Sequence, residues 1–241
     1  MKALRDLAAS FSYFSVFPAP YAENDGGPST GAVAWVPLVG LAIGALSGLG
    51  AYGVARLTHA PVAAAITAWV LSIALSGAIH VDGFLDCCDG LFAMVSPQRR
   101  LEIMRDPHHG TYAIVGMAII SVLWVYALAN IPAWALPYAV AAAAFAARLG
   151  AVAMRPSARL PIAVWVVFFL IATAIGRNYA PALGAGFVAT WLVPAAVLFF
   201  ARRRLDGTLN GDCYGAAIVV SEIALLMISA VSTSLGPGLL R

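Results

Sequence analysis

Apolar and polar stretches alternate along this chain, and seven of the apolar stretches are long enough to cross a bilayer. A transmembrane helix needs about 20 mostly apolar residues. The seven stretches cover residues 32–54, 61–80, 112–130, 133–153, 160–176, 182–201 and 215–235. The pattern therefore predicts an all-α fold, a polytopic membrane helical bundle of about seven transmembrane helices.

The first twenty residues form a shorter and less regular apolar segment. Lys2 and Arg5 precede an apolar run that serines interrupt and that ends on Pro18 and Pro20. A cleaved signal peptide has an uninterrupted apolar core, which this segment lacks. We therefore expect an N-terminal interfacial or re-entrant helix.

The composition agrees with a membrane protein and excludes several other classes. Of the 241 residues, 62% are hydrophobic and 10% are charged, which excludes a water-soluble domain with a charged surface. We treat residues 1–241 as a single integral membrane domain. The net charge of +3 is small and the arginines are scattered among acids, so we expect no nucleic-acid partner. The three cysteines, two of them adjacent, predict buried thiols rather than disulfides.

The basic residues predict an orientation, because excess Lys and Arg mark the cytoplasmic side of a membrane protein. Placing successive polar segments on alternate sides puts 11 of the 14 basic residues on one side. These are Lys2, Arg5, Arg99, Arg100, Arg105, Arg148, Arg155, Arg159, Arg202, Arg203 and Arg204. The N-terminus and the long segment 81–111 lie on this side. We expect 81–111 to be a cytoplasmic acidic and basic active-site segment, since long ordered connections tend to be functional.

Three aspartates stand within eight residues of this segment, in "IHVDGFLDCCDG" at 79–90. If the second span continues as a helix, Asp82, Asp86 and Asp89 share one face, because they are spaced i, i+4 and i+7. Such close carboxylates repel one another unless a cation lies among them. Oxygen ligands suit Mg²⁺ or Mn²⁺ better than zinc. The alternative is a solvated acidic helix end.

A second acidic pair, Glu102 and Asp106, precedes the next span and is interleaved with arginines. Arg99, Arg100 and Arg105 put cations beside these carboxylates. A metal-chelated diphosphate needs this mixture, because acids hold the metal and arginines bind the remaining phosphate oxygens. Positive-inside charge with surface ion pairs is the alternative interpretation for the first two arginines.

The start of the third span and the residues around it add further candidates. Gly110 and Thr111 open a helix whose free N–H groups can bind an anion, although ordinary capping explains them equally well. His108 and His109 are interpreted as exposed loop histidines or as bases. His80 points about 200° away from the aspartate face on a continuous helix, which favours an indirect or structural role.

The segment "LNGDCYGA" at 209–216 opens the last span and carries Asn210 and Asp212. Its glycines allow a ligand to approach the backbone closely, and a simple turn with an N-cap is the alternative. Inside that span, Glu222 should face the bundle or a wet cavity, as either a ligand contact or a structural hydrogen-bonding group. The residues Gly40, Gly44 and Gly48 form a small-residue ridge that favours close helix packing over the lining of a ligand cavity.

Four sequence blocks occur in an order that resembles bacterial cobalamin synthase, the adenosylcobinamide-GDP ribazoletransferase family. The blocks are "WVPLVGLAIG", "HVDGFLDCCDGLF", "RRLEIMRDPHHGTYA" and "NGDCYGA". The opening "SFSYFSVFPAP" is also similar to that family. Two departures, Pro107 where the family often has Ser and Asn210 where it usually has Thr, remove no charged group.

The resemblance implies a multi-pass enzyme of the bacterial cell inner membrane, with its active site facing the cytoplasm. It implies Mg²⁺-dependent joining of adenosylcobinamide-GDP to α-ribazole or its 5'-phosphate, with release of GMP. The implied catalytic residues are Asp82, Asp86, Asp89, Asp106 and Asp212. The implied metal ligands are Asp82, Asp86, Asp89, Asp106 and Glu102. The implied substrate-binding residues are His80, Arg99, Arg100, Arg105, Asn210, Gly110 and Thr111. Its partners are these substrates and the lipid bilayer, and a homo-oligomer is compatible with the sequence.

Two other functions remain as alternatives. "DCCDGLFA" at 86–93 partly reproduces the Asp-x-x-Asp-Gly-x-x-Ala-Arg signature of the CDP-alcohol phosphotransferases of phospholipid synthesis, but Met94 replaces its arginine. A cation-coupled transporter would need ionisable groups near the middle of the membrane, where Glu222 alone qualifies.

Overall fold

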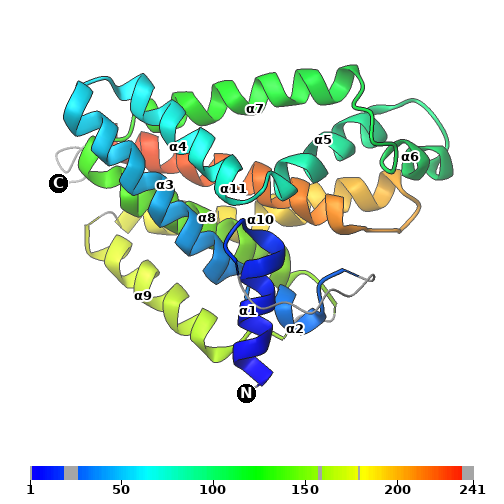
Figure 1. Cartoon of the computed structure of the whole chain (residues 1–241), viewed down its shortest axis with the longest axis horizontal. Coiled ribbons are helices and arrows are strands. Elements are labelled where there is room, and N and C mark those ends of the chain that lie inside the picture. The colour runs from blue at the N-terminus through cyan, green and yellow to red at the C-terminus, as the bar shows by residue number, and fades with distance from the viewer. Residues whose placement is uncertain (1, 19–26, 157–158, 179, 235–241) are drawn as a thin grey trace.

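The computed structural model describes residues 2–18, 27–156, 159–178 and 180–234, and these form helices with no strand (Figure 1). The helices are α1 (Lys2–Phe14), α2 (Thr30–Val33), α3 (Val36–Thr58), α4 (Pro61–Leu75), α5 (Ile79–Phe92), α6 (Pro97–Ile103), α7 (Thr111–Ala129), the 3-10 helix η1 (Ala133–Ala135), α8 (Leu136–Ala153), α9 (Ile162–Asn178), α10 (Ala180–Arg204) and α11 (Gly211–Ser234). The predicted all-α class is confirmed. The predicted N-terminal helix is present as α1.

Five of these helices, within the described residues, are long and apolar enough to cross a membrane. They are α3, α7, α8 with η1, α10 from Gly184, and α11. A sixth span exists only if α4 and α5 are counted together. The apolar part of α9, Ile162–Ile171, is shorter than a span. A multi-pass membrane protein is therefore supported, whereas the predicted number of seven spans is not confirmed.

The chain breaks sharply between α4 and α5. The two helices meet at 92°. Gly77 and Ala78 have φ values of 59° and 60°, a left-handed conformation that cannot continue an α-helix. The prediction that one straight helix carries the second span into the aspartates is therefore wrong. The aspartates lie instead on a separate helix, α5, which packs between α7 and α11 (Figure 1).

The glycine ridge of α3 packs directly against α8. A Cβ atom at Gly44 would lie 2.6 Å from the carbonyl oxygen of Val140, and one at Gly48 would lie 2.7 Å from that of Leu136. Side chains at these positions would therefore push the helices apart. The packing interpretation of this ridge is confirmed.

A buried ion pair joins α8 to α11. Nη1 of Arg148 lies 2.9 Å from Oε2 of Glu222, and both residues are buried. The same guanidinium also donates to the carbonyl oxygen of Ala144. Glu222 therefore has a structural partner. The assignment of Arg148 to the cytoplasmic polar segments is corrected, because it lies inside the bundle and does not count as loop charge.

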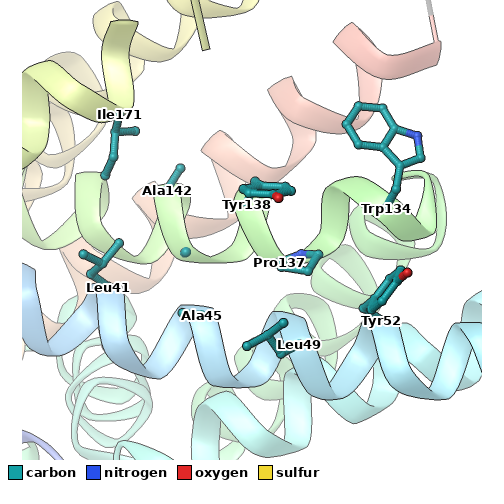
Figure 2. Close-up of a pocket in the computed structure, with 10 residues that line it drawn as sticks. Leu41, Ala45, Leu49, Tyr52, Trp134, Pro137, Tyr138, Ala142 and Ile171 are labelled. Atoms are coloured by element: carbon teal, nitrogen blue, oxygen red, sulfur yellow. The ribbon is translucent and has the colours of Figure 1, made fainter. Parts of the chain in front are cut away.

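An apolar cavity of about 680 Å³ lies between α3, α8 and α9 (Figure 2). Tyr52, Trp134 and Tyr138 line it together with aliphatic side chains, and the described lining includes no charged residue. It offers nothing to polarise a phosphate. The candidate chemistry must therefore be sought elsewhere in the bundle.

The buried ion pair gives a test of the fold. Replacing Glu222 with leucine leaves Arg148 charged and unpaired in the interior, and we expect a loss of about 3–5 kcal/mol of stability. The double variant R148M/E222L removes both charges and should recover most of this loss. Thermal unfolding of the purified proteins in detergent measures both effects. Equal unfolding midpoints for the single and double variants would contradict the coupling.

Candidate active site

Close contact between α5 and the start of α11 creates the candidate site. A Cβ at Gly83 of α5 would lie 2.8 Å from Cα of Asp212, so only glycine allows this approach. A Cβ atom at Gly215 of α11 would lie 3.3 Å from the carbonyl oxygen of His80. Two glycines from distant sequence blocks thus bring the aspartate of α11 to the aspartates of α5.

The carboxylates along α5 differ in exposure. Asp82 is exposed, Asp86 is partly buried and Asp89 is buried. The imidazole of His109 lies beside the first two, with ring nitrogens 3.7 Å from Oδ1 of Asp82 and 3.8 Å from Oδ1 of Asp86. We call Asp82, Asp86, Asp212 and His109 the carboxylate cluster. The sequence favours an exposed loop position for His109, with a base or a phosphate donor as the alternative, and the structure places its ring beside two aspartates.

The neighbouring charges of the cluster shift the pKa of Asp86, a residue that lies outside the five candidate spans. Burial, together with the neighbouring carboxylates Asp82 and Asp212, raises the pKa of Asp86 to about 6. His109 acts in the opposite direction. The raised pKa therefore reflects burial first and then repulsion from the neighbouring carboxylates.

Asp89 has a different role from its two neighbours on α5. Its Oδ2 accepts a hydrogen bond from the backbone N–H of Gly110 at 2.6 Å, and its Oδ1 accepts one from that of Ala113 at 3.0 Å. The first N–H groups of α7 are therefore capped by the Asp89 carboxylate, which is the capping alternative, and substrate binding by Gly110 and Thr111 stays a prediction. A Cβ at Gly110 would lie 2.9 Å from this carboxylate, so glycine is required there.

Asn210 holds the beginning of α11 and positions Asp212. Its Oδ1 accepts a hydrogen bond from the backbone N–H of Cys213, and its Nδ2 donates to Oδ2 of Asp212 at 2.7 Å. The first contact is an ordinary N-cap. Asn210 therefore contributes to the site by orienting a carboxylate.

Two arginines hold the far end of α5. Arg100 donates from Nη1 to the carbonyl oxygen of Leu91 and from Nε to that of Val95. Arg204 donates to the carbonyl oxygens of Leu91 and Ala93. The last carbonyls of a helix lack intrahelical partners, and cations stabilise them. The structure thus places Arg100, a predicted substrate-binding residue, in a buried structural position.

The second acidic pair lies apart from the carboxylate cluster. Glu102 pairs with Arg99 on the exposed surface of α6 at 2.6 Å. Asp106 accepts hydrogen bonds from the backbone and the ring of His108, and these bonds hold its pKa below the usual range. Neither acid contacts the α5 aspartates within the described residues. Arg105 is exposed and has no ion pair there.

His80 lies on the buried side of α5, away from the exposed Asp82. Its ring stacks on Phe14 with centroids 5.9 Å apart. It also lines a cavity of about 30 Å³ together with Arg148 and Glu222. The prediction that its ring points away from the aspartate face therefore agrees with its position.

The predicted metal ligands do not form a preassembled metal site in the described part of the chain. Within the described part of the chain, no three His, Cys, Asp or Glu side chains are arranged so that they could hold a metal ion. The ligand set Asp82, Asp86, Asp89, Asp106 and Glu102 therefore stays a prediction. The three cysteines, Cys87, Cys88 and Cys213, are buried free thiols, as expected.

Comparison with known proteins gives consistent matches over most of the chain. The family model for cobalamin-5-phosphate synthase matches residues 6–230. A Deinococcus radiodurans protein named adenosylcobinamide-GDP ribazoletransferase is 32% identical, covering 91% of this chain and 83% of the relative. A protein of the same name from Ralstonia nicotianae is 30% identical, and the match covers 97% of this chain and 97% of the relative. Another from Bradyrhizobium diazoefficiens is 31% identical, and the match covers 94% of each chain. No solved structure gives a significant match.

The glycine contact beneath the carboxylate cluster can be tested by adding one methyl group. We expect Gly83→Ala to lower the thermal unfolding midpoint in detergent, because its Cβ meets the backbone of Asp212. Gly53→Ala is the matched control, since nothing lies within 4 Å of its Cβ. That control should leave the midpoint unchanged or raise it slightly. A Gly83→Ala protein as stable as the control would contradict the tight α5–α11 approach.

Proposed function

Because the chain belongs to the cobalamin-5-phosphate synthase family, we propose that it is an adenosylcobinamide-GDP ribazoletransferase. The reaction joins adenosylcobinamide-GDP to α-ribazole or its 5'-phosphate and releases GMP. The structural observation that carries the proposal is the carboxylate cluster between α5 and α11. Its members come from three of the sequence blocks that resemble the family: Asp82 and Asp86 from the second, His109 from the third and Asp212 from the fourth.

The proposed reaction is one direct displacement at phosphorus. The ribose 3'-hydroxyl oxygen of the ribazole bonds to the phosphorus that carries the cobinamide side. The bond from that phosphorus to the bridging oxygen breaks, and GMP leaves with this oxygen and the second phosphate. The hydroxyl proton passes to a base. Since the two substrates are held together, no covalent enzyme intermediate is needed.

The residues of the cluster fit a divalent cation by their chemistry. Asp82 and Asp86 offer oxygen donors, which suit Mg²⁺, with Mn²⁺ as a substitute. Such an ion would neutralise charge that develops on the leaving phosphate. The repulsion between Asp86 and its neighbouring carboxylates supports this assignment.

Helix α6 and the loop that connects it to α7 supply the positive charge that a diphosphate needs. Arg105 is exposed and unpaired among the described residues, and Arg99 is held only by a surface ion pair that contributes little. Both can turn to phosphate oxygens, for which the planar guanidinium is well suited. Asp89 maintains the position of this loop through its bonds to the start of α7.

Asp212 is the residue best placed to receive the attacking hydroxyl. It belongs to the carboxylate cluster and also lines a separate cavity between α1, α5 and α11. Asn210 fixes one of its oxygens. A carboxylate at this junction can accept the hydroxyl proton while the substrate lies in the cavity.

The decisive assay compares substrates. Purified protein in lipid receives Mg²⁺ with adenosylcobinamide-GDP and α-ribazole 5'-phosphate, or with CDP-diacylglycerol and an alcohol. GMP release in the first mixture alone supports the proposal. CMP release in the second would indicate a CDP-alcohol phosphotransferase, and no reaction in either would favour the transporter.

The carboxylate cluster predicts strong effects of single substitutions. Asp82→Asn and Asp86→Asn should each lower kcat by about 10²–10³-fold, because they remove charge that holds the cation. Asp206→Asn is the matched control, since Asp206 is exposed at φ 49°, a conformation that asparagine also adopts. Turnover within a few-fold of wild type at saturating Mg²⁺ would remove the substituted residue from the site.

The proposed location is the bacterial inner membrane, with the cluster facing the cytoplasm. The positive-inside bias supports this orientation. We expect an impermeant thiol reagent added to intact spheroplasts to label Thr58→Cys at the end of α3 and not Gln98→Cys on α6. The native cysteines are buried and give a low background. The reverse labelling pattern would invert the proposed topology.

A further inference from the structure

A cavity of about 330 Å³ adjoins the carboxylate cluster on the side of α1. Phe14 of α1, His80 of α5, Arg155 after α8, and Asp212 and Tyr214 of α11 are among the residues that line it. Asp212 is thus shared between the cavity and the cluster. A ligand in this cavity can reach the carboxylates without displacing any helix.

The cavity combines aromatic surface with one cation. Tyr13 and Phe14 contribute aromatic rings, and Phe14 already stacks on the His80 ring. The guanidinium of Arg155 lies over the Tyr214 ring, 4.3 Å from its centroid. Aromatic rings stack on the heterocyclic base of a nucleotide, whereas an arginine binds its phosphate.

Arg155 is available for an anion. It forms no ion pair with any described residue, and its contact with Tyr214 is through the face of the guanidinium. The N–H donors of arginine lie in the plane of the group and are not consumed by a stacked ring. In the sequence, Arg155 contributes only to the predicted membrane orientation, because no neighbouring residue in the chain indicates a ligand.

The size of the cavity discriminates between the two proposed substrates. Cavities of about 300–1,000 Å³ enclose small organic ligands. The cavity, at about 330 Å³, matches one small nucleotide. A corrinoid with its attached nucleoside diphosphate is several times larger and must lie mainly outside it. Placing the smaller substrate here leaves the exposed side of the cluster, with Asp82 and His109, open to the larger one.

Resting on the proposed function, we propose that this cavity binds the ribazole substrate and that Arg155 binds its 5'-phosphate. The bicyclic base lies against the aromatic side chains of α1, and the ribose hydroxyl faces Asp212. Arg155 thereby makes the site prefer α-ribazole 5'-phosphate over unphosphorylated α-ribazole. It touches substrate at a group that does not react, so it acts on binding more than on turnover.

The test is the substrate dependence of Arg155→Gln in the full-length protein in lipid nanodiscs. We expect KM for α-ribazole 5'-phosphate to rise about 10- to 100-fold, as for the loss of a hydrogen bond between charged groups. KM for unphosphorylated α-ribazole and for adenosylcobinamide-GDP should stay within about threefold of wild type. Arg155→Lys should recover part of the phosphate preference.

Matched variants separate this role from general damage. Arg203→Gln is the control, because Arg203 also lies over an aromatic ring, that of Phe199, but does not line the cavity. It should leave every KM unchanged. Phe14→Ala should raise KM for both forms of ribazole and not for adenosylcobinamide-GDP. An Arg155→Gln protein with unchanged preference, or with a raised KM for adenosylcobinamide-GDP alone, would overturn the proposal.

A binding measurement keeps the two proposals distinguishable. Calorimetric titration of α-ribazole 5'-phosphate into wild-type protein requires no turnover, and we expect binding that Arg155→Gln weakens at least tenfold. No binding to the wild type would overturn the cavity assignment even if GMP is released in the full reaction. Binding that depends on Arg155 without GMP release from any mixture would instead overturn the proposed transferase activity and leave the cavity as a nucleotide site.

Discussion

The close approach of α5 and α11 is the constraint on which the candidate site depends. At Gly83 the two helices approach so closely that one methyl group would meet the backbone of Asp212. This contact brings together carboxylates that lie more than 120 positions apart in the chain, and it raises the pKa of Asp86 through Asp82 and Asp212 as well as through burial. Helix backbones come this near only where both side chains are missing or small.

Gathering negative charge costs stability, and the surrounding structure offsets this cost at defined points. The buried carboxylate Asp89 is satisfied by the first N–H groups of α7, so it does not add fully to the repulsion. Arg100 and Arg204 fix the opposite end of α5 through its terminal carbonyls. The aspartate helix is therefore fixed along its length, while among the described residues the ion-pair partner of Asp82 and Asp86 is the His109 ring.

The two sides of the carboxylate cluster have different chemistry. One side leads to a cavity with aromatic rings and Arg155, whereas on the other side Asp82 is exposed and His109 of the loop before α7 lies beside it. A transferase that joins a small nucleotide to a much larger diphosphate needs such an arrangement, because each substrate must reach the same reacting atoms from its own direction. The 92° break between α4 and α5 makes it possible, since it lets the aspartate helix pack against α11 and α7.

The sequence by itself determined the features that depend on local composition, namely helix formation, close helix packing and the residues that share a helix face. Apolar length predicted an all-helical membrane protein, glycine spacing predicted that another helix packs closely on residues 40–48, and charge spacing placed Asp82 and Asp86 on one face of a helix. Only the tertiary structure decided which charged groups meet, because contacts between helices depend on bends and approach distances that no local pattern encodes. The left-handed residues at Gly77 and Ala78 ended a helix that apolarity alone would have continued. Likewise, Arg148 became a buried partner of Glu222 and Arg155 the cation of a cavity, although both look like loop charges in the chain.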